Sequence, residues 1–201
     1  LPEMPKARKE RFIDQFNVSE EEARILTSDR TTGKFFEEVI SESREWIKSF
    51  EVKEKVLSEE AKRVIKLTSN WIVSRLFGLL KEKGMTMEQC KISPENFAEL
   101  MSMIHKNKIS SSAAQKVLQV MFERGADPSQ VVEEMDLAQM TSKEDLERVV
   151  DTVMKNNPWS VQDYKKGKTQ ALQYLIGQVM SLTQGKADPK VAAEILKEKL
   201  E

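Results

Sequence analysis

The sequence predicts an all-α protein, and three observations support this fold class. Apolar residues recur at spacings of three and four in "FAELMSMI" (97–104) and "LERVVDTVM" (146–154), which is typical of amphipathic helices. No stretch alternates apolar and polar residues convincingly, as a half-buried strand would. Four of the six prolines directly follow a residue that can cap a helix N-terminus, in the pairs Ser93-Pro94, Asp127-Pro128, Asn157-Pro158 and Asp188-Pro189.

The composition limits the classes of protein to consider. With 39% hydrophobic and 32% charged residues in a chain of 201, the protein can bury a core and remain hydrated outside. No apolar run approaches the roughly 20 residues that span a bilayer, and no signal-peptide pattern is present. The single cysteine, Cys90, cannot form an internal disulfide, which fits a reducing compartment. The formal net charge of −1 argues against nucleic-acid binding through bulk charge, although the distribution of charge matters more than its sum.

The N-terminal half reads as a series of helices. The chain opens with an apolar-Pro pair instead of methionine, so we expect a fragment whose upstream part is missing. "SEEE" (19–22) has the spacing of a capping box at a helix start. The longest expected helix covers 58–83, and its apolar residues spread widely round the axis, so we expect burial on more than one side. Gly84 and Gly125 are expected to end helices.

A change of composition near "ERGADPSQ" (123–130) predicts a domain boundary. Gly125 is expected to end one helix there, and Asp127-Pro128 to begin the next. An acidic stretch follows them. We predict a multi-helix domain at 1–128 and a small domain of three or four helices at 129–201. Within the second domain, "SKED" (142–145) has the spacing of a weaker, acidic variant of the capping box.

The stretch "QVMSLTQGKADPKVAAEILKEKL" (178–200) contains a helix stop followed by a helix start. We predict that Gly185 closes the preceding apolar helix as a left-handed C′ residue. Asp188 is then expected to cap the next helix, and Pro189 to occupy its first position. Both roles are structural, which leaves Lys186 as the residue of this turn that is free for another role.

Gly177 lies inside the preceding apolar helix, where glycine costs up to about 1 kcal/mol relative to alanine. One compensation is the close approach of a second helix. Since Tyr174 and Ser181 share the face of Gly177, we expect a tight crossing on that face.

Neither Gly-Lys pair of this region fits a nucleotide-binding loop. A P-loop requires a glycine five residues before the pair, a hydroxyl residue after it, and a preceding strand. Gly185-Lys186 lacks the hydroxyl residue, and Gly167-Lys168 has Gln162 where the first glycine is required. We therefore exclude phosphate cradles of this type.

The sequence contains no candidate catalytic or metal site. His105, the single histidine, stands at a predicted helix end, where a surface or C-cap role is favoured, and Cys90 stands in a connecting loop. A zinc site would need carboxylates for its other ligands, and no suitable spacing is present. The methionines of the predicted helices are interpreted as core filling, with an adaptable binding surface as the alternative: Met101, Met103, Met121, Met135, Met140, Met154 and Met180.

Five lysines near the C-terminus are candidate contacts for an anionic partner. Positions 164–190 hold five lysines and one acid, whereas 123–163 hold ten acids and four bases. Lys168 and Lys186 would lie about 27 Å apart on one regular helix, so they could touch separated points of a nucleic-acid backbone but could not grip one phosphate. The alternative is that these residues are solvated helix ends. The five candidates are Lys165, Lys166, Lys168, Lys186 and Lys190.

The segment "DYKKGKTQALQYLIGQVMSLTQGKADPKVAAEILKEKL" (163–200) resembles the end of the B subunit in the aspartyl/glutamyl-tRNA amidotransferase family, and also the related small YqeY proteins. The matching pattern is a tyrosine, a Gly-Lys, an Ala-Leu, a Gly-Gln-Val-Met, and a Gly-Lys-Ala before Pro189. Upstream, 70–85, 92–101 and 107–128 resemble the family in the same order. The resemblance covers essentially the whole chain.

The resemblance implies a domain organisation and a function. Residues 1–34 would be the exit segment from a catalytic domain that this chain lacks, and 129–201 would be a YqeY-like domain. The family converts Glu-tRNA(Gln) to Gln-tRNA(Gln) and Asp-tRNA(Asn) to Asn-tRNA(Asn) with ATP and glutamine. ATP and Mg²⁺ are implied for the missing catalytic domain, with no cofactor in this fragment. The implied partners are tRNA(Gln) or tRNA(Asn) and the A and C subunits of the amidotransferase, with no membrane and no DNA. A bacterial-type cytoplasmic location follows, and an organellar homologue stays open.

In the family the C-terminal domains engage the body of the tRNA. The resemblance extends this contact to the five candidate lysines, with Gly167, Gly177, Gly185, Asp188 and Pro189 as the structural motif. Ser181 and Gln184 stand where relatives often carry basic residues, and Asp188 replaces the usual asparagine. Fewer positive charges lower the affinity for phosphate. Two functions therefore stay open: a tail that holds tRNA without catalysis, and a protein-interaction or stabilising tail without RNA contact.

Overall fold

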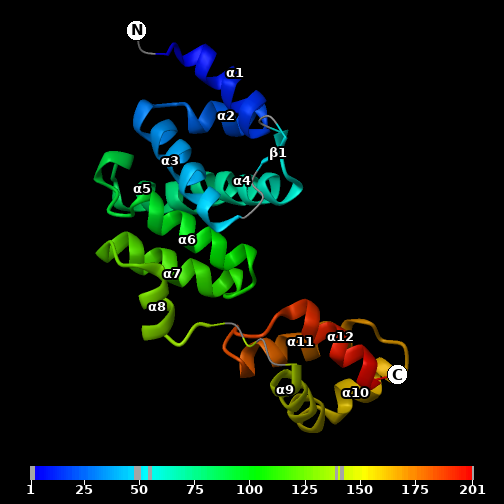
Figure 1. Ribbon diagram of the computed structural model, residues 1–201. Coiled ribbons are helices and arrows are strands. Elements are labelled where there is room, and N and C mark those ends of the chain that lie inside the picture. Colours follow the sequence, from blue (N-terminus) through cyan, green and yellow to red (C-terminus); the bar gives the residue numbers. More distant parts are fainter. Residues whose placement is uncertain (1–2, 48–50, 54–55, 139, 141–142, 201) are drawn as a thin grey trace. The chain divides into compact units, whose positions relative to one another are not determined.

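In a computed structural model, the structure describes residues 3–47, 51–53, 56–138, 140 and 143–200. Within these residues the fold is helical except for one short antiparallel pair of strands, β1 (Glu51–Lys53) and β2 (Val56–Leu57) (Figure 1). The predicted all-α class is confirmed. Strands of three and two residues are too short to show alternation in the sequence, so the pair was not predicted.

The described residues form two compact units. The first comprises 1–106 and 115–134, and the second comprises 107–114 and 135–201. Helix α8 therefore falls in the first unit, although the sequence placed the domain boundary between 128 and 129. Up to that point the helices are α1 (Pro5–Phe16), α2 (Glu20–Leu26), α3 (Arg30–Trp46), α4 (Glu59–Trp71), α5 (Phe77–Lys83), α6 (Pro94–His105), α7 (Ser111–Arg124) and α8 (Pro128–Glu134).

The core of the first unit starts close to the N-terminus. Phe12 and Phe16 of α1 pack against Phe36 of α3, with ring centroids 5.2–5.4 Å apart. Further along α3, Phe35 packs edge to face on Phe97 of α6. All of these rings are at least nine-tenths buried. The segment 3–34 thus contributes buried side chains, Phe12 and Phe16 among them, to the core of this unit.

Charged side chains fasten α1 to α3. The guanidinium of Arg8 pairs with Glu37 at 2.6 Å, and Arg11 pairs with both Glu3 and Glu37. A Cβ atom at Gly33 would lie 2.7 Å from Cζ of Arg8. Glycine at this position therefore lets the guanidinium lie directly on α3.

The predicted capping box at the start of α2 is confirmed. The backbone N–H of Glu22 donates to Oγ of Ser19 at 3.2 Å, and the N–H of Ser19 donates to the Glu22 carboxylate at 2.8 Å. The hydroxyl of Ser69 in α4 donates to the same carboxylate at 2.9 Å. Glu22 therefore stabilises both the start of α2 and its contact with α4.

We expect the first unit to lose stability in acid through Glu22 and similar carboxylates. Burial alone would raise the pKa of Glu22, but the hydrogen bonds from Ser19 and Ser69 lower it below its usual value. A carboxyl with a lowered pKa in the folded state stabilises the fold above its unfolded pKa, and this contribution is lost as the pH falls through the folded pKa. The thermal midpoint should therefore fall between about pH 5 and about pH 3. The Glu22→Gln variant should fall less over this range, and an equal fall would contradict the assignment.

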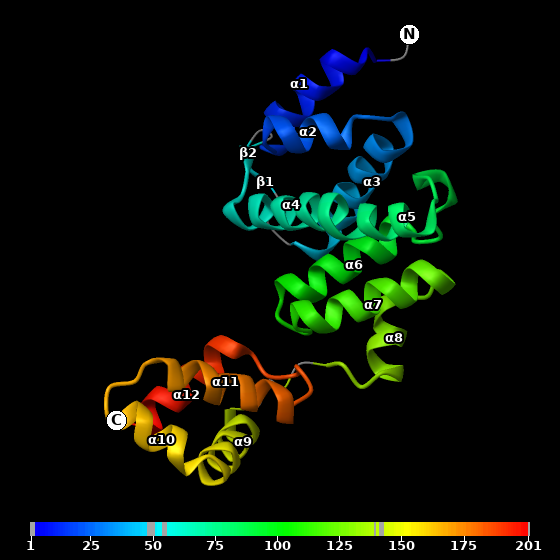
Figure 2. The ribbon, with the colours of Figure 1, turned by 180° about the vertical axis from the view of Figure 1, so that it is seen from behind.

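The long helix predicted at 58–83 is a continuous helical run with a change of register. Figure 2 shows α4 and α5 in line, and between them Ile72–Leu76 forms a π-helical segment. The extra residue in that turn shifts the buried side, so burial extends round the helix, as expected from its apolar residues. Gly84 (φ +62°) and Gly125 (φ +70°) follow α5 and α7 in the left-handed conformation, so both predicted helix ends are confirmed.

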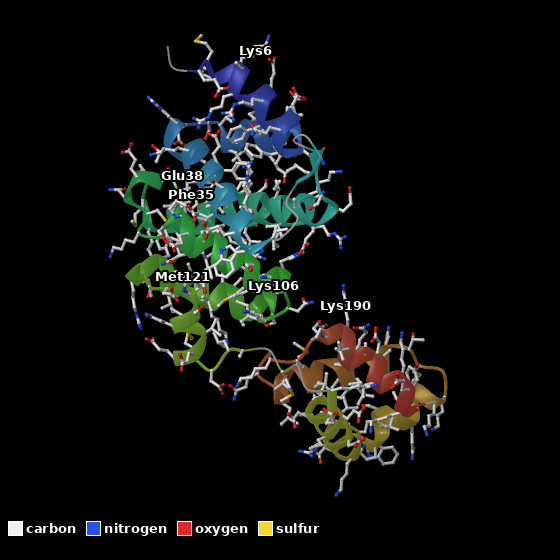
Figure 3. The ribbon with its side chains drawn as sticks, in the orientation of Figure 1. Lys6, Phe35, Glu38, Lys106, Met121 and Lys190 are labelled. Carbon is white, nitrogen blue, oxygen red and sulfur yellow. The ribbon has the colours of Figure 1, made fainter. Side chains whose placement is uncertain are left out.

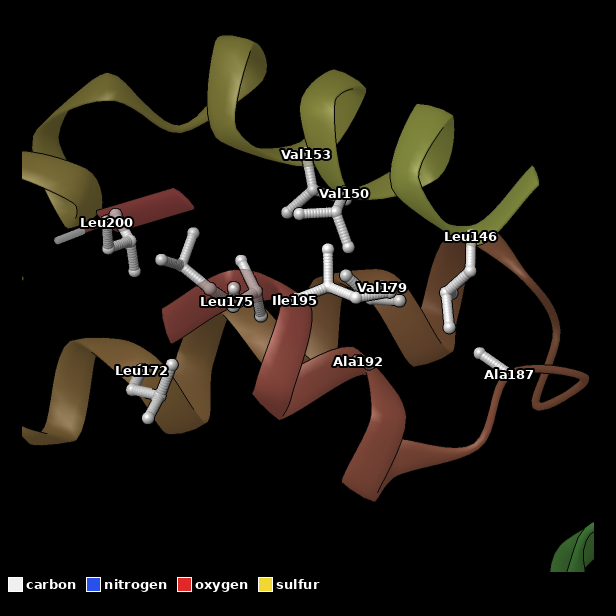
Figure 4. Close-up of a cluster of buried hydrophobic side chains, with 11 residues drawn as sticks. Leu146, Val150, Val153, Leu172, Leu175, Val179, Ala187, Ala192, Ile195 and Leu200 are labelled. Atoms are coloured by element: carbon white, nitrogen blue, oxygen red, sulfur yellow. The ribbon is translucent and has the colours of Figure 1, made fainter. Parts of the chain in front are cut away.

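From Met135 onwards, the described part of the second unit has four helices. They enclose one apolar core, shown in Figure 4, with side chains from the first, third and fourth helices. Val150 and Leu175 both belong to this core and are fully buried. The helices are α9 (Lys143–Asn156), α10 (Pro158–Lys165), α11 (Gln170–Leu182) and α12 (Pro189–Leu200).

Candidate nucleic-acid interface

The connection between α10 and α11 presents the first group of candidate lysines. The N–H of Gly167 donates to the carbonyl of Tyr164 at 2.8 Å, and the N–H of Lys168 donates to that of Asp163 at 3.0 Å. These two bonds form a Schellman motif with Gly167 at C′, and its φ of +89° explains the glycine. The motif stops α10 abruptly and leaves Lys165 and Lys168 exposed beside the start of α11.

The start of α11 lacks a side-chain cap. Its N-cap residue, Thr169, has helical backbone angles, and its side chain accepts no hydrogen bond from the first amides of the helix. Two of these amides donate to backbone carbonyls instead, Ala171 to Lys168 at 3.0 Å and Leu172 to Thr169 at 3.1 Å. The start of the helix still carries the positive end of the helix dipole, which favours a phosphate nearby. Lys168 pairs with Asp163 at 3.0 Å, but both side chains are exposed, so this pair stabilises the fold by about 1 kcal/mol at most. A phosphate could replace Asp163 at small cost.

The turn between α11 and α12 corrects the predicted position of the helix stop. The N–H of Gly185 donates to the carbonyl of Met180, and the N–H of Gln184 donates to that of Ser181. In this second Schellman motif Gln184 is the C′ residue, with φ +53°, and Gly185 follows at C″ with φ +81°. The prediction of Gly185 at C′ was wrong by one residue, because a non-glycine residue takes the left-handed position.

Asp188 caps α12, as predicted. Its carboxylate accepts from the N–H of Lys190 at 2.8 Å, and Pro189 is the first residue of the helix. The side chain of Lys190 is exposed and points away from the ribbon (Figure 3).

Lys186 is not free, contrary to the expectation from sequence. Its ammonium pairs with Asp136, and its backbone carbonyl accepts from the N–H of Met140 at 2.7 Å. The Lys186 side chain is only 24% exposed. It therefore holds the segment before α9 against the turn, a role that depends on a residue fifty positions earlier in the chain.

The two lysine groups lie at opposite ends of α11. The regular helix has 13 residues, or about 20 Å, whereas the distance of about 27 Å expected from the sequence assumed one helix through both turns. One phosphate still cannot reach both groups. The two lysine groups can therefore contact a nucleic-acid backbone only at separate phosphates.

Gly177 has no helix against it. A Cβ atom built there would meet no atom within 4 Å among the described residues, and the residue is exposed. The predicted tight crossing on the face of Tyr174 and Ser181 is therefore wrong for this part of the chain. Packing within the fold gives no reason for glycine at this position.

We therefore expect Gly177→Ala to raise the stability of the second unit. Alanine removes the entropic cost of a helical glycine, so the free energy of unfolding should rise by about 0.5–1 kcal/mol. Gly167→Ala, at a positive φ, should lower the same quantity by about 1–2 kcal/mol. Urea denaturation followed by circular dichroism would measure both changes. A loss of stability in Gly177→Ala would contradict the open surroundings of this residue.

Two exposed aromatic residues near these turns were not predicted as site residues. Trp159 of α10 is 80% exposed, and Tyr174 of α11 is 51% exposed. The Tyr174 hydroxyl lies 3.4 Å from Oδ1 of Asn157. Exposed aromatic rings can stack on nucleic-acid bases. The sequence does carry a signal for the exposure of Trp159. Residues 158–165 form a weakly amphipathic helix, which has no apolar side that would bury this residue.

Outside this region lie the single histidine and the single cysteine. His105 ends α6 and lies 3.2 Å from Glu60, and burial raises the pKa of the Cys90 thiol. No group of three or more potential metal-ligating side chains occurs among the described residues. None of the helices described is both long and apolar enough to cross a membrane. Met101, Met103 and Met121 are buried, as core filling predicts, whereas Met135 is 42% exposed.

Comparison with known proteins identifies the family. Residues 51–200 match the GatB domain. The B subunit of the aspartyl/glutamyl-tRNA(Asn/Gln) amidotransferase of Clostridium beijerinckii is 39% identical over 200 residues, that of Caldanaerobacter subterraneus 37%, and that of Rickettsia canadensis 34%. Each comparison covers 100% of this chain but only 37–38% of the relative, so the chain spans less than two fifths of their length. The resemblance found in the sequence is confirmed: the chain belongs to the GatB domain family.

Proposed function

We propose that this chain is the tRNA-holding tail of the B subunit of a tRNA-dependent amidotransferase. The parent enzyme would convert Glu-tRNA(Gln) to Gln-tRNA(Gln), or Asp-tRNA(Asn) to Asn-tRNA(Asn), with ATP and glutamine. The tail positions the body of the tRNA and performs no chemistry. The observation that carries the proposal is the cluster of exposed lysines around the uncapped start of α11, in a chain of this family.

The geometry supports positioning of the RNA and gives no means of reading its sequence. Lys165, Lys166 and Lys168 reach phosphates at the start of α11, and Lys190 reaches a separate one near the start of α12. Contacts to phosphate fix the register and orientation of a nucleic acid without reading its bases. The choice between tRNA(Gln) and tRNA(Asn) therefore rests on other parts of the enzyme.

The chemistry of the reaction belongs, in this proposal, to parts of the enzyme outside this chain. ATP and Mg²⁺ would act in the catalytic domain of the B subunit. Ammonia would come from the A subunit, and the C subunit would join the other two. The described residues offer no cluster of ligands that fits a metal ion, and no reaction step is assigned to them. The location that goes with this proposal is a bacterial-type cytoplasm, and an organellar homologue stays open.

A second candidate function is a protein-interaction tail that stabilises the B subunit without RNA contact. One specific observation favours it: Lys168 and Lys186 are already paired with carboxylates of the chain itself. Lys165, Lys166 and Lys190 make no ion pair within the described residues. These three lysines therefore favour the tRNA-holding role over the interaction tail.

Deletion of 135–201 from the parent enzyme complex separates the two functions, because α8 and the first unit stay intact. A mobility-shift titration with tRNA should show weaker binding while the subunits still assemble. Unchanged tRNA affinity and unchanged transamidation would refute the tRNA-holding role. Lost assembly with normal affinity of the remaining subunits for tRNA would support the interaction tail.

A further inference from the structure

Helix α11 lies within the least charged segment of its unit. No Asp, Glu, Lys or Arg occurs in the 17 residues from 169 to 185, although 32% of the chain is charged. The apolar residues of this segment account for the core, since Leu172, Leu175 and Val179 are buried. Core packing does not explain the neutral residues on the opposite side. Exposed helix positions usually carry charge, so this face differs from an ordinary solvated surface.

Five exposed residues of α11 form one continuous face, and the exposed Leu182 lies beside it at the end of the helix. Their spacings of three and four place them along one side of the helix. At the centre of this face Gly177 carries no side chain, and the space above it is open within 4 Å among the described residues. The residues of this face are Gln170, Gln173, Tyr174, Gly177 and Ser181, all exposed. We call it the uncharged face.

Positive charge stands at both ends of the uncharged face. Lys165 and Lys166 lie before α11 and Lys190 lies after it, and none of them makes an ion pair within the described residues. Three carboxylates nearby have partners of their own: Asp163 pairs with Lys168, Asp136 pairs with Lys186, and Asp188 accepts from the N–H of Lys190. This arrangement complements a polyanion. The lysines at the two ends would meet its charged groups, and the uncharged face between them would meet an uncharged part of its surface.

We propose that the uncharged face of α11 lies against the ribose edge of an A-form RNA minor groove, with Gly177 as the point of closest approach. This inference rests on the proposed function and specifies which part of the RNA is bound. The A-form minor groove is wide and shallow and displays 2′-hydroxyl groups, which both donate and accept hydrogen bonds. Glutamine amides and the hydroxyls of Tyr174 and Ser181 also donate and accept. Glycine at the centre lets the sugar edge approach the helix backbone.

The closing experiment uses Gly177→Gln in the full chain. Glutamine is neutral and favours a helix more than glycine does, so the fold is kept while the close approach is blocked. Gly78→Gln is the matched control, because Gly78 is also exposed, helical and open within 4 Å, but lies in α5 of the first unit. The probes are transcribed tRNA(Gln) and DNA of the same sequence, titrated by mobility shift at several salt concentrations.

We expect Gly177→Gln to bind the transcript at least about tenfold more weakly, with an unchanged salt slope, because a steric block removes no phosphate contact. Gly78→Gln should bind like the wild type. The wild type should prefer RNA to the matched DNA, and Gly177→Gln should lose most of this preference.

The contrary outcomes show whether this inference alone fails or the proposed function fails with it. Normal binding by Gly177→Gln, while lysine variants bind weakly, would overturn this inference and leave the proposed function standing. Equal binding of RNA and DNA by the wild type would overturn the ribose contact. No binding of the transcript by the wild-type chain would overturn both.

Discussion

Replacement of Lys165, Lys166, Lys168 and Lys190 by alanine is expected to weaken tRNA binding by about two orders of magnitude at moderate salt and to flatten its salt dependence. Each phosphate contact contributes about 0.9 to the slope of log K against log salt, so the loss of four contacts should lower the slope by about 3–4. Lys186 is left unchanged because its pair with Asp136 holds the turn together. Filter binding between about 50 and about 200 mM salt measures the slope.

The matched control replaces the same four lysines by arginine. Arginine keeps the charge at each position, so the salt slope should stay near that of the wild type. The four side chains are exposed, and neither set of substitutions should change the helical content of the second unit. An alanine variant with unchanged affinity and slope would contradict phosphate contact at these residues.

Leu175→Ala is expected to remove much of the stability of the second unit. Leu175 is fully buried at the centre of the core shown in Figure 4. Removing a buried leucine side chain costs about 2–5 kcal/mol, because the transfer energy is lost and a cavity remains. A unit of this size has a total stability of roughly 3–10 kcal/mol, so the substitution removes much of it. Amide hydrogen exchange in α11 and α12 should become far faster, while exchange in α4 and α6 stays slow.

Leu182→Ala is the matched control on the same helix. Leu182 is 55% exposed, so its replacement should change the stability by less than about 0.5 kcal/mol. Equal destabilisation by both variants would contradict the core as described. Unfolding that spreads to α4 and α6 in Leu175→Ala would contradict the independence of the two units.

The helix starts were predictable because their chemistry is local. Ser93, Asp127 and Asp188 each accept from a backbone amide two or three residues later, as the proline pairs predicted. Asn157 differs, because its side-chain amide donates to the backbone carbonyl of Val153 at 2.8 Å. This bond completes the end of α9, and the side chain does not cap α10. A cap residue between two adjacent helices can serve either one, and the sequence does not distinguish the two cases. The capping-box variant at 142–145 lies partly outside the described residues.

Features that depend on distant residues escaped prediction. The pair between Lys186 and Asp136 joins residues fifty positions apart, and no spacing rule connects them. The open surroundings of Gly177 are likewise a tertiary property, because only the packed fold shows that no helix crosses there. The positions of the lysines at helix ends followed from the sequence, whereas the ion pairs of Lys168 and Lys186 required the structure.

The contact between the second unit and the tRNA body is tested most directly by chemical footprinting. The parent complex and a version lacking 135–201 would be compared on the same tRNA. We predict that deletion removes ribose protection in the tRNA body and leaves protection of the acceptor end intact. Identical protection patterns with and without 135–201 would contradict the tRNA-holding role of this unit.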